Sequence, residues 1–168
     1  MWKQIPGTVN ATHAGVLKDA DESLREAERF HTGCGRVHKT MNALIQRLGD
    51  AGISHAIIGG MALNAHGYRR ETTDLDLLVT AEGLERFDKS IAPELYTDIS
   101  TRKRKRYVDR HTEIVVDFVI AGDPAGRDEP CPVTFPSPVD DSILIDGNRV
   151  ITLPKLIDIK LASGMTTR

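Results

Sequence analysis

Two aspartates stand two residues apart in "TDLDLLV" (residues 73–79), a stretch that otherwise has the composition of a buried strand. Because side chains alternate between the two faces of a strand, Asp74 and Asp76 point the same way. Leu75 and Leu77 point to the opposite face. Neighbouring carboxylates repel each other and are costly to bury, and a divalent cation between them removes this cost. The spacing suits Mg²⁺, which completes its shell with water and phosphate oxygens. The alternative is a solvent-facing pair without a ligand.

A third carboxylate, Asp117, lies inside "IVVDFVI" with apolar residues on both sides. A charged residue in the middle of such a strand needs a partner. One interpretation is a salt bridge to an arginine or lysine. The other places Asp117 on a strand beside Asp74 and Asp76. Three carboxylates together can hold two metal ions roughly 3.5–4 Å apart, which is the arrangement for phosphoryl or nucleotidyl transfer.

Two glycines, Gly59 and Gly60, follow the apolar strand "HAII" and open a helix. Such a turn lets backbone N–H groups approach an anion closely, and the start of a helix favours negative charge. The sequence therefore predicts a phosphate site beside the metal site.

Patterning predicts the elements that must position these residues. Helical periodicity predicts helices over residues 17–30, 37–53, 61–67, 81–91 and 153–164. Composition predicts strands over residues 55–60, 73–79, 95–100 and 112–121, and a hairpin over 142–152 that turns at Asp146-Gly147. Residues 1–15 are expected to form a loose arm and residues 122–140 a loop. Early alternation followed by hairpins predicts an α/β (α+β) fold, with a mixed sheet, helices packed on it and N-terminal helices before the Gly-Gly segment.

A basic run occupies the first half of "RKRKRYVDR", residues 102–110. We expect this segment to be an edge strand that forms a hairpin with residues 112–121. Strand alternation places Arg102, Arg104 and Arg106 on one face, where they would guide RNA, tRNA or a triphosphate into the cleft. The alternative is a solvated edge strand that its charges protect from aggregation.

The 168 residues fit one globular core, with 40% hydrophobic residues and a formal net charge of -2. This near balance of charge argues against a generally basic nucleic-acid surface. Cys34 and Cys131 are far apart, which argues against a disulfide framework and a zinc site. Without a signal peptide or an apolar run of membrane-spanning length, we expect a cytoplasmic protein with no membrane partner.

The Gly-Gly pair, the Asp-x-Asp strand and the later lone aspartate resemble the nucleotidyltransferase superfamily with the polymerase-beta-like fold. The segment "GGMALNAHGYRRETTDLDLLV" looks most like the AbiEii-type toxins and related minimal nucleotidyltransferases. Its matching residues are Gly59, Gly60, His66, Gly67, Arg70, Thr72, Asp74 and Asp76. "LPKLIDIK" resembles the family helix that brings a lysine to the active site, here Lys160. Met61 departs from the pattern, because many members have serine there.

This resemblance covers roughly residues 40–163 and implies a division of the chain. Residues 1–35 would be an N-terminal arm and helix, and residues 36–168 a nucleotidyltransferase-like domain. The short final helix suggests that a C-terminal helical part is missing.

The resemblance also implies a Mg²⁺-dependent enzyme that uses a nucleoside triphosphate such as ATP. It would transfer the nucleoside monophosphate to a hydroxyl or phosphate of RNA, protein or a small molecule. It would act as a toxin of a toxin-antitoxin or phage-defence system, with an antitoxin protein as partner. Two alternatives are a catalytically degenerate nucleotide- or partner-binding module on the same fold, and a non-enzymatic nucleic-acid binder built on residues 102–106.

The implied residue roles follow the superfamily. Asp74, Asp76 and Asp117 would hold a two-ion site, with Asp117 accepting the proton of the acceptor hydroxyl. The nucleotide would be bound by Gly59, Gly60, Arg70, Thr72 and Lys160. Structural roles are open for three of these: an ion pair for Arg70, strand propensity for Thr72 and a surface position for Lys160.

Overall fold

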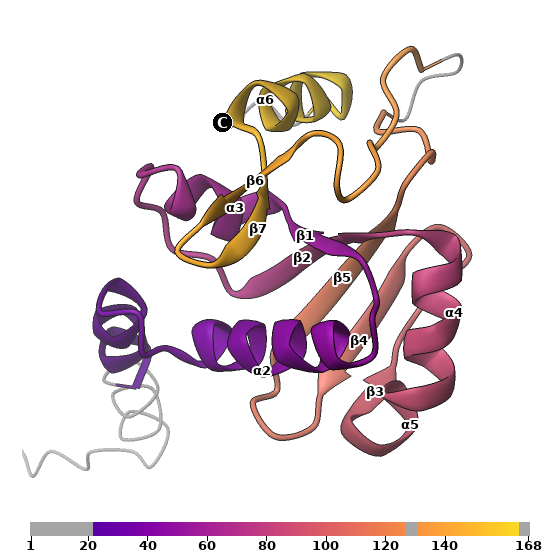
Figure 1. Ribbon diagram of the computed structural model, residues 1–168. Helices are drawn as coiled ribbons and strands as arrows, with labels where there is room; N and C mark the ends of the chain where they lie inside the picture. The colour runs from indigo at the N-terminus through magenta and orange to yellow at the C-terminus, as the bar shows by residue number, and fades with distance from the viewer. Residues whose placement is uncertain (1–21, 127–130, 165–168) are drawn as a thin grey trace, which may run out of the picture.

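A seven-stranded mixed sheet forms the centre of the molecule, as the computed structural model shows (Figure 1). The structure describes residues 22–126 and 131–164. The predicted arm over 1–15 and the start of the predicted helix 17–30 lie outside these residues. The strand order is β3-β4-β5-β2-β1-β7-β6. The strands are β1 (His55–Ile57), β2 (Asp74–Val79), β3 (Tyr96–Asp98), β4 (Lys105–Asp109), β5 (Val115–Ile120), β6 (Ser142–Ile145) and β7 (Asn148–Ile151).

Strand directions confirm the predicted mixed sheet. β2 pairs in parallel with β5, and β1 in parallel with β7, while the other four pairings are antiparallel. The helices are α2 (Arg36–Asp50), α3 (Gly59–Ala65), α4 (Ala81–Ser90), α5 (Ala92–Leu95) and α6 (Leu153–Ala162), and residues 22–31 are also helical. Within the described residues, no helix is long and apolar enough to cross a membrane.

Helix α2 covers the sheet with the apolar stripe that the sequence predicts. Its residues Val37, Met41, Leu44 and Leu48 are buried, and Gly52 ends the helix segment with a φ of 62°. Helices α4 and α5 lie beside α2 and fill the same side of the sheet (Figure 1). This layer leaves the opposite face of β2 and β5 available for polar side chains.

An aromatic cluster fixes α4 against β4 and β5. The ring of Phe87 lies 5.1 Å from that of Tyr107 and 4.8 Å from that of Phe118, measured between centroids. Tyr96 of β3 packs on the same ring at 5.3 Å. Tyr107 follows Arg106 on β4 and Phe118 follows Asp117 on β5, so burial of these two rings turns Arg106 and Asp117 to the other face of the sheet.

The predicted hairpin at Asp146-Gly147 is confirmed. Asp146 and Gly147 have φ angles of 50° and 80°, which is the left-handed pair that a tight two-residue hairpin turn requires. β6 and β7 pair on either side of this turn.

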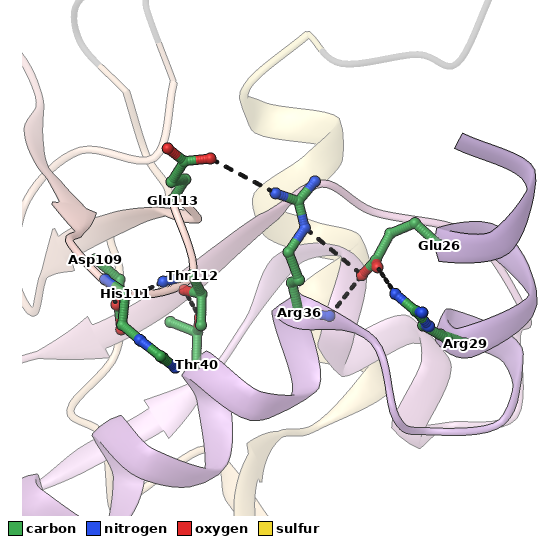
Figure 2. A network of polar contacts seen from close by, with 8 residues as sticks. All are labelled: Glu26, Arg29, Arg36, Thr40, Asp109, His111, Thr112 and Glu113. Carbon is green, nitrogen blue, oxygen red and sulfur yellow. Dashed lines mark hydrogen bonds and ion pairs between the residues drawn. The ribbon is translucent and has the colours of Figure 1, made fainter. Parts of the chain in front are cut away.

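Polar contacts tie the start of α2 to the turn between β4 and β5 (Figure 2). The hydroxyls of Thr40 and Thr112 are hydrogen-bonded at 2.5 Å, and the Asp109 carboxylate accepts the Thr112 N–H. The Glu26 carboxylate accepts the Arg36 N–H, so the helix over residues 22–31 is joined to the same corner. This network holds the β4–β5 hairpin against α2.

Two predictions about the strands are wrong. The basic segment is not an edge strand, because β3 pairs with β4 along its outer side and makes β4 an interior strand. The strand over 55–60 is shorter than predicted, because β1 ends at Ile57 and both glycines belong to the first turn of α3.

Candidate metal centre

Strand register brings the three predicted carboxylates together. Asp76 of β2 lies directly beside Asp117 of β5 in the parallel pairing, and Asp74 is two residues earlier on the same face of β2. One carboxylate oxygen from each residue lies within 4.8 Å of the other two. Leu75 and Leu77 are fully buried on the opposite face. The cluster therefore sits on the side of the sheet that α2 and α4 do not cover.

The cluster carries more negative charge than its neighbours neutralise. Burial, followed by the charges of Asp74 and Asp117, raises the pKa of Asp76 to about 7 from an ordinary value of 3.8. The Lys160 ammonium and the Gly60 N–H lower this pKa without restoring it. A bound divalent cation would supply the missing positive charge, and carboxylate oxygens are ligands that Mg²⁺ and Mn²⁺ accept. The donor set thus fits a hard divalent ion.

Asp117 also has the arginine partner that the alternative interpretation expected. The Arg106 Nε donates to Asp117 Oδ1 at 2.6 Å, and the side chains retain only 33% and 17% of their exposure. Arg106 lies directly opposite Asp117 in the antiparallel β4–β5 pairing. Asp117 therefore forms the salt bridge and also lies beside the other two aspartates, so both interpretations of this residue are confirmed.

The prediction that Arg102, Arg104 and Arg106 share one strand face is wrong. β4 begins only at Lys105, and the Thr101 N–H donates to the Arg104 carbonyl at 2.9 Å across the turn that precedes it. Arg102 and Arg104 are exposed in this turn, whereas Arg106 points into the acidic cluster. The role of Arg106 as a partner of Asp117 was missed, because it depends on the register of two strands.

Thr72 contacts the cluster through its hydroxyl. Thr72 Oγ1 donates to Asp74 Oδ1 at 2.7 Å. A Cβ at Gly60 would lie 2.8 Å from Thr72 Cβ, so glycine at this position leaves room for the threonine. Thr72, predicted as a nucleotide-binding residue, here orients a carboxylate.

Gly59 is required by close approach as well as by backbone conformation. Its φ is 65°, and a Cβ at this position would lie 1.9 Å from Asp76 Oδ2. The Asp76 carboxylate also accepts the N–H of Gly60. The two predicted phosphate-binding glycines are thus packed against the acidic cluster.

Arg70 and Lys160, the two predicted cationic residues of the site, lie on different segments. Arg70 is exposed in the loop before β2, and its backbone N–H and carbonyl are bound by the side chain of Asn64 at 2.7 and 2.6 Å. Lys160 lies on α6, and its charge acts on Asp76. The contact of Asn64 with Arg70 was not predicted, because it joins a helical side chain to a loop residue six positions later.

His66 and Met61, which lie in the segment that begins with Gly59-Gly60, contribute to the packing of the fold. His66 Nε2 is 2.7 Å from the Ile151 carbonyl and joins α3 to β7. Met61, which stands where many superfamily members have serine, is 5% exposed in the core.

Two surface hollows of about 370 and 420 Å³ lie elsewhere, between α2, α5 and the β4–β5 turn.

Comparisons with known proteins support the fold. A crystal structure from Thermotoga maritima, of a protein described as a candidate nucleotidyltransferase, matches with a TM-score of 0.51. The match covers 74% of this chain and 85% of that chain, at 16% sequence identity. No family model matches the sequence, and no curated protein is significantly similar to it. The chain therefore has a nucleotidyltransferase-like fold.

We predict that Gly59→Ala disrupts the cluster, because the added methyl group displaces the Asp76 carboxylate. The matched control is Gly67→Ala, since Gly67 also has a positive φ, 90°, but open space around its Cβ position. The control should cost about 1–2 kcal/mol of unfolding free energy, and Gly59→Ala should cost more. Urea unfolding with and without Mn²⁺ measures both effects. Equal costs, with Mn²⁺ stabilising both variants alike, would contradict the prediction.

We predict that Asp76 makes the metal-free protein less stable as pH rises. Its pKa is about 7 when folded and 3.8 ordinarily, so within this window the folded state holds a proton that the unfolded state has lost. The free energy of unfolding should fall there by at most about 1.4 kcal/mol per pH unit. Asp76→Asn should remove this pH dependence. The free energy of unfolding of the variant, relative to that of the wild type, should therefore rise from pH 4 to 7 and then level off. Urea unfolding in EDTA measures this difference; a constant difference across the window would refute the assignment.

Proposed function

We propose that this protein is a Mg²⁺-dependent nucleotidyltransferase that transfers a nucleoside monophosphate from a nucleoside triphosphate to an acceptor. The observation that supports it most is the cluster of Asp74, Asp76 and Asp117 on one sheet face. The elevated pKa of Asp76 supports it further, because burial and then the charges of Asp74 and Asp117 disfavour the ionised carboxylate, and a bound cation would favour it. The nucleotidyltransferase-like fold agrees with this reading.

Asp74 and Asp76 would hold the ion that contacts the triphosphate, and Asp117 would join them at the acceptor side. The bound ions would offset charge on the phosphates and lower the pKa of the acceptor group. The Asp117 oxygen that Arg106 leaves open would face both the ion and the acceptor, and its remaining lone pair would take the proton of the acceptor hydroxyl. The hydroxyl oxygen forms a bond to the α-phosphorus in the same step. The bond from this phosphorus to the bridging oxygen breaks, and pyrophosphate leaves.

Cationic side chains would bind the triphosphate from both sides of the cluster. Lys160 on α6 already acts on Asp76, and the exposed side chain of Arg70 is free to reach out from a loop whose backbone is anchored by Asn64. Both would offset charge on the phosphates and on the leaving pyrophosphate. Gly59 and Gly60 would shape the floor of the site and keep Asp76 in place.

RNA is the acceptor class that we propose first. Arg102 and Arg104 are exposed in the turn before β4, only a few residues from Arg106 at the cluster. Two arginines so placed would contact the phosphates of a single strand as it enters the site. The similarity to AbiEii-type toxins, the toxin role and an antitoxin partner remain hypotheses from the sequence resemblance.

The proposal predicts metal-dependent transfer of label. The protein is incubated with Mg²⁺, total RNA and each α-labelled ribonucleoside triphosphate in turn, and the labelled products are resolved. Asp74→Asn and Asp76→Asn should each reduce transfer more than about 100-fold. A lost ligand costs more than a lost outer hydrogen bond, which costs roughly 10–100-fold. Asp140→Asn, an exposed aspartate outside the cluster, is the control and should retain activity.

Other outcomes separate the alternatives. Triphosphate binding without transfer to RNA or to protein in a cell extract would favour a degenerate binding module. RNA binding that survives Asp76→Asn but is lost in Arg102→Ala/Arg104→Ala would favour a nucleic-acid binder. If the protein neither binds a triphosphate nor transfers label, the proposed function is contradicted.

A further inference from the structure

Each carboxylate of the cluster receives a hydrogen bond from a different part of the fold. The Thr72 hydroxyl donates to Asp74 Oδ1 at 2.7 Å. The Gly60 N–H at the start of α3 donates to the carboxylate of Asp76. Arg106 of β4 donates to Asp117. We call these three donors the caps of the acidic cluster.

The caps restrict how the carboxylates bind an ion. An oxygen that already accepts a short hydrogen bond, such as Asp74 Oδ1 or Asp117 Oδ1, is directed toward its donor. Each of these carboxylates then presents mainly its other oxygen to an ion, which makes it a monodentate ligand. Ca²⁺ takes six to eight oxygens and often binds carboxylates with both oxygens, whereas Mg²⁺ requires octahedral geometry at about 2.0–2.1 Å. A set of monodentate ligands therefore favours the smaller ion.

We propose that Arg106 is a positioning residue that sets the metal selectivity of this cluster, because it holds Asp117 as a monodentate ligand. This inference rests on the proposed function, since it takes the cluster to be the metal site. The preferred ions are small octahedral cations such as Mg²⁺ and Mn²⁺, and Ca²⁺ is disfavoured.

The backbone around Arg106 is built to keep its side chain in place. The Arg106 N–H donates to Ser100 Oγ at 3.1 Å, and the Arg106 carbonyl accepts the Ile99 N–H at 2.9 Å. On the other side, Arg106 is paired in register with Asp117. The neighbouring Tyr107 is buried in the aromatic cluster, so β4 cannot slip by one residue without exposing that ring.

Two substitutions at Arg106 separate the hydrogen bond from the charge. The contact to Asp117 is made by Nε, the fourth side-chain atom from Cα. Arg106→Gln places an amide nitrogen at this atom, so it keeps a donor and loses the charge. Arg106→Met places a methyl group there, so it loses both. The two variants thus share their length and neutral charge and differ in the polar amide group that supplies the donor.

The measurement is divalent-ion affinity of the full chain without nucleotide, at pH 8. Mn²⁺ binding is followed by electron paramagnetic resonance, and Ca²⁺ binding by competition with Mn²⁺. The quantity compared is the ratio of the Ca²⁺ and Mn²⁺ dissociation constants. Because both ions carry the same charge, losing the arginine charge changes both affinities and leaves this ratio nearly unchanged.

Arg106→Met should lower the preference for Mn²⁺ over Ca²⁺ by about tenfold, on the scale of the roughly 10–100-fold affinity losses that outer-shell substitutions cause at metal sites. Arg106→Gln should keep the wild-type ratio. If Arg106→Met does not fold, Arg106→Leu, which also lacks the donor and the charge, takes its place in the comparison with Arg106→Gln. Thr72→Val against Thr72→Ser repeats the comparison at Asp74. Equal ratios within the folded pairs would overturn the inference.

Asp76→Asn distinguishes failure of this inference from failure of the proposed function. If wild type binds Mn²⁺ and Asp76→Asn does not, the cluster is the metal site, and equal ratios would overturn only the role of Arg106. If wild type binds no Mn²⁺, or if Asp76→Asn binds it equally well, both proposals fail.

Discussion

The burial of one carboxylate beside two others is the constraint on which the arrangement of this site depends. Asp74, Asp76 and Asp117 share one face of two parallel neighbouring strands, and the pKa of Asp76 rises to about 7 as a result of burial and of its two neighbours. Such a cluster is tolerated because several polar groups are directed at it. Lys160 and the Arg106 guanidinium offset part of the charge, and hydrogen bonds from Thr72, Gly60 and Arg106 hold the oxygens in place.

Hydrophobic packing on the opposite face of the same strands stabilises the fold that carries this cluster. Leu75, Leu77, Val116 and Phe118 are buried under the helices, and the ring of Phe87 holds β5 and β4 in register. Because side chains alternate, burying these residues forces the three aspartates and Arg106 outward on the other face. The hydrophobic core and the acidic site are therefore two consequences of one register.

Sequence reasoning located the aspartates because their faces follow from strand alternation, and the apolar run around Asp117 made its strand evident. It located the Asp146-Gly147 hairpin because that dipeptide specifies the turn. It could not place Arg106, since a one-residue change in the turn after Asp109 would reverse its face. It also took β4 for an edge strand, because β3 has only three residues and gives a weak signal. The predicted strand over 55–60 extended too far, because glycines usually break helices and Gly59 and Gly60 nevertheless form the first turn of α3.

The most direct test of the account is the carboxyl ¹³C shift of Asp76, followed by NMR across pH with and without Mg²⁺. Without the ion, we expect a midpoint near pH 7. Saturating Mg²⁺ should move that midpoint down by more than one pH unit, because an ion bound to the cluster stabilises the ionised carboxylate. A midpoint near the ordinary 3.8 without Mg²⁺, or one near 7 that Mg²⁺ leaves unchanged, would contradict the claim that this cluster is a divalent-metal site.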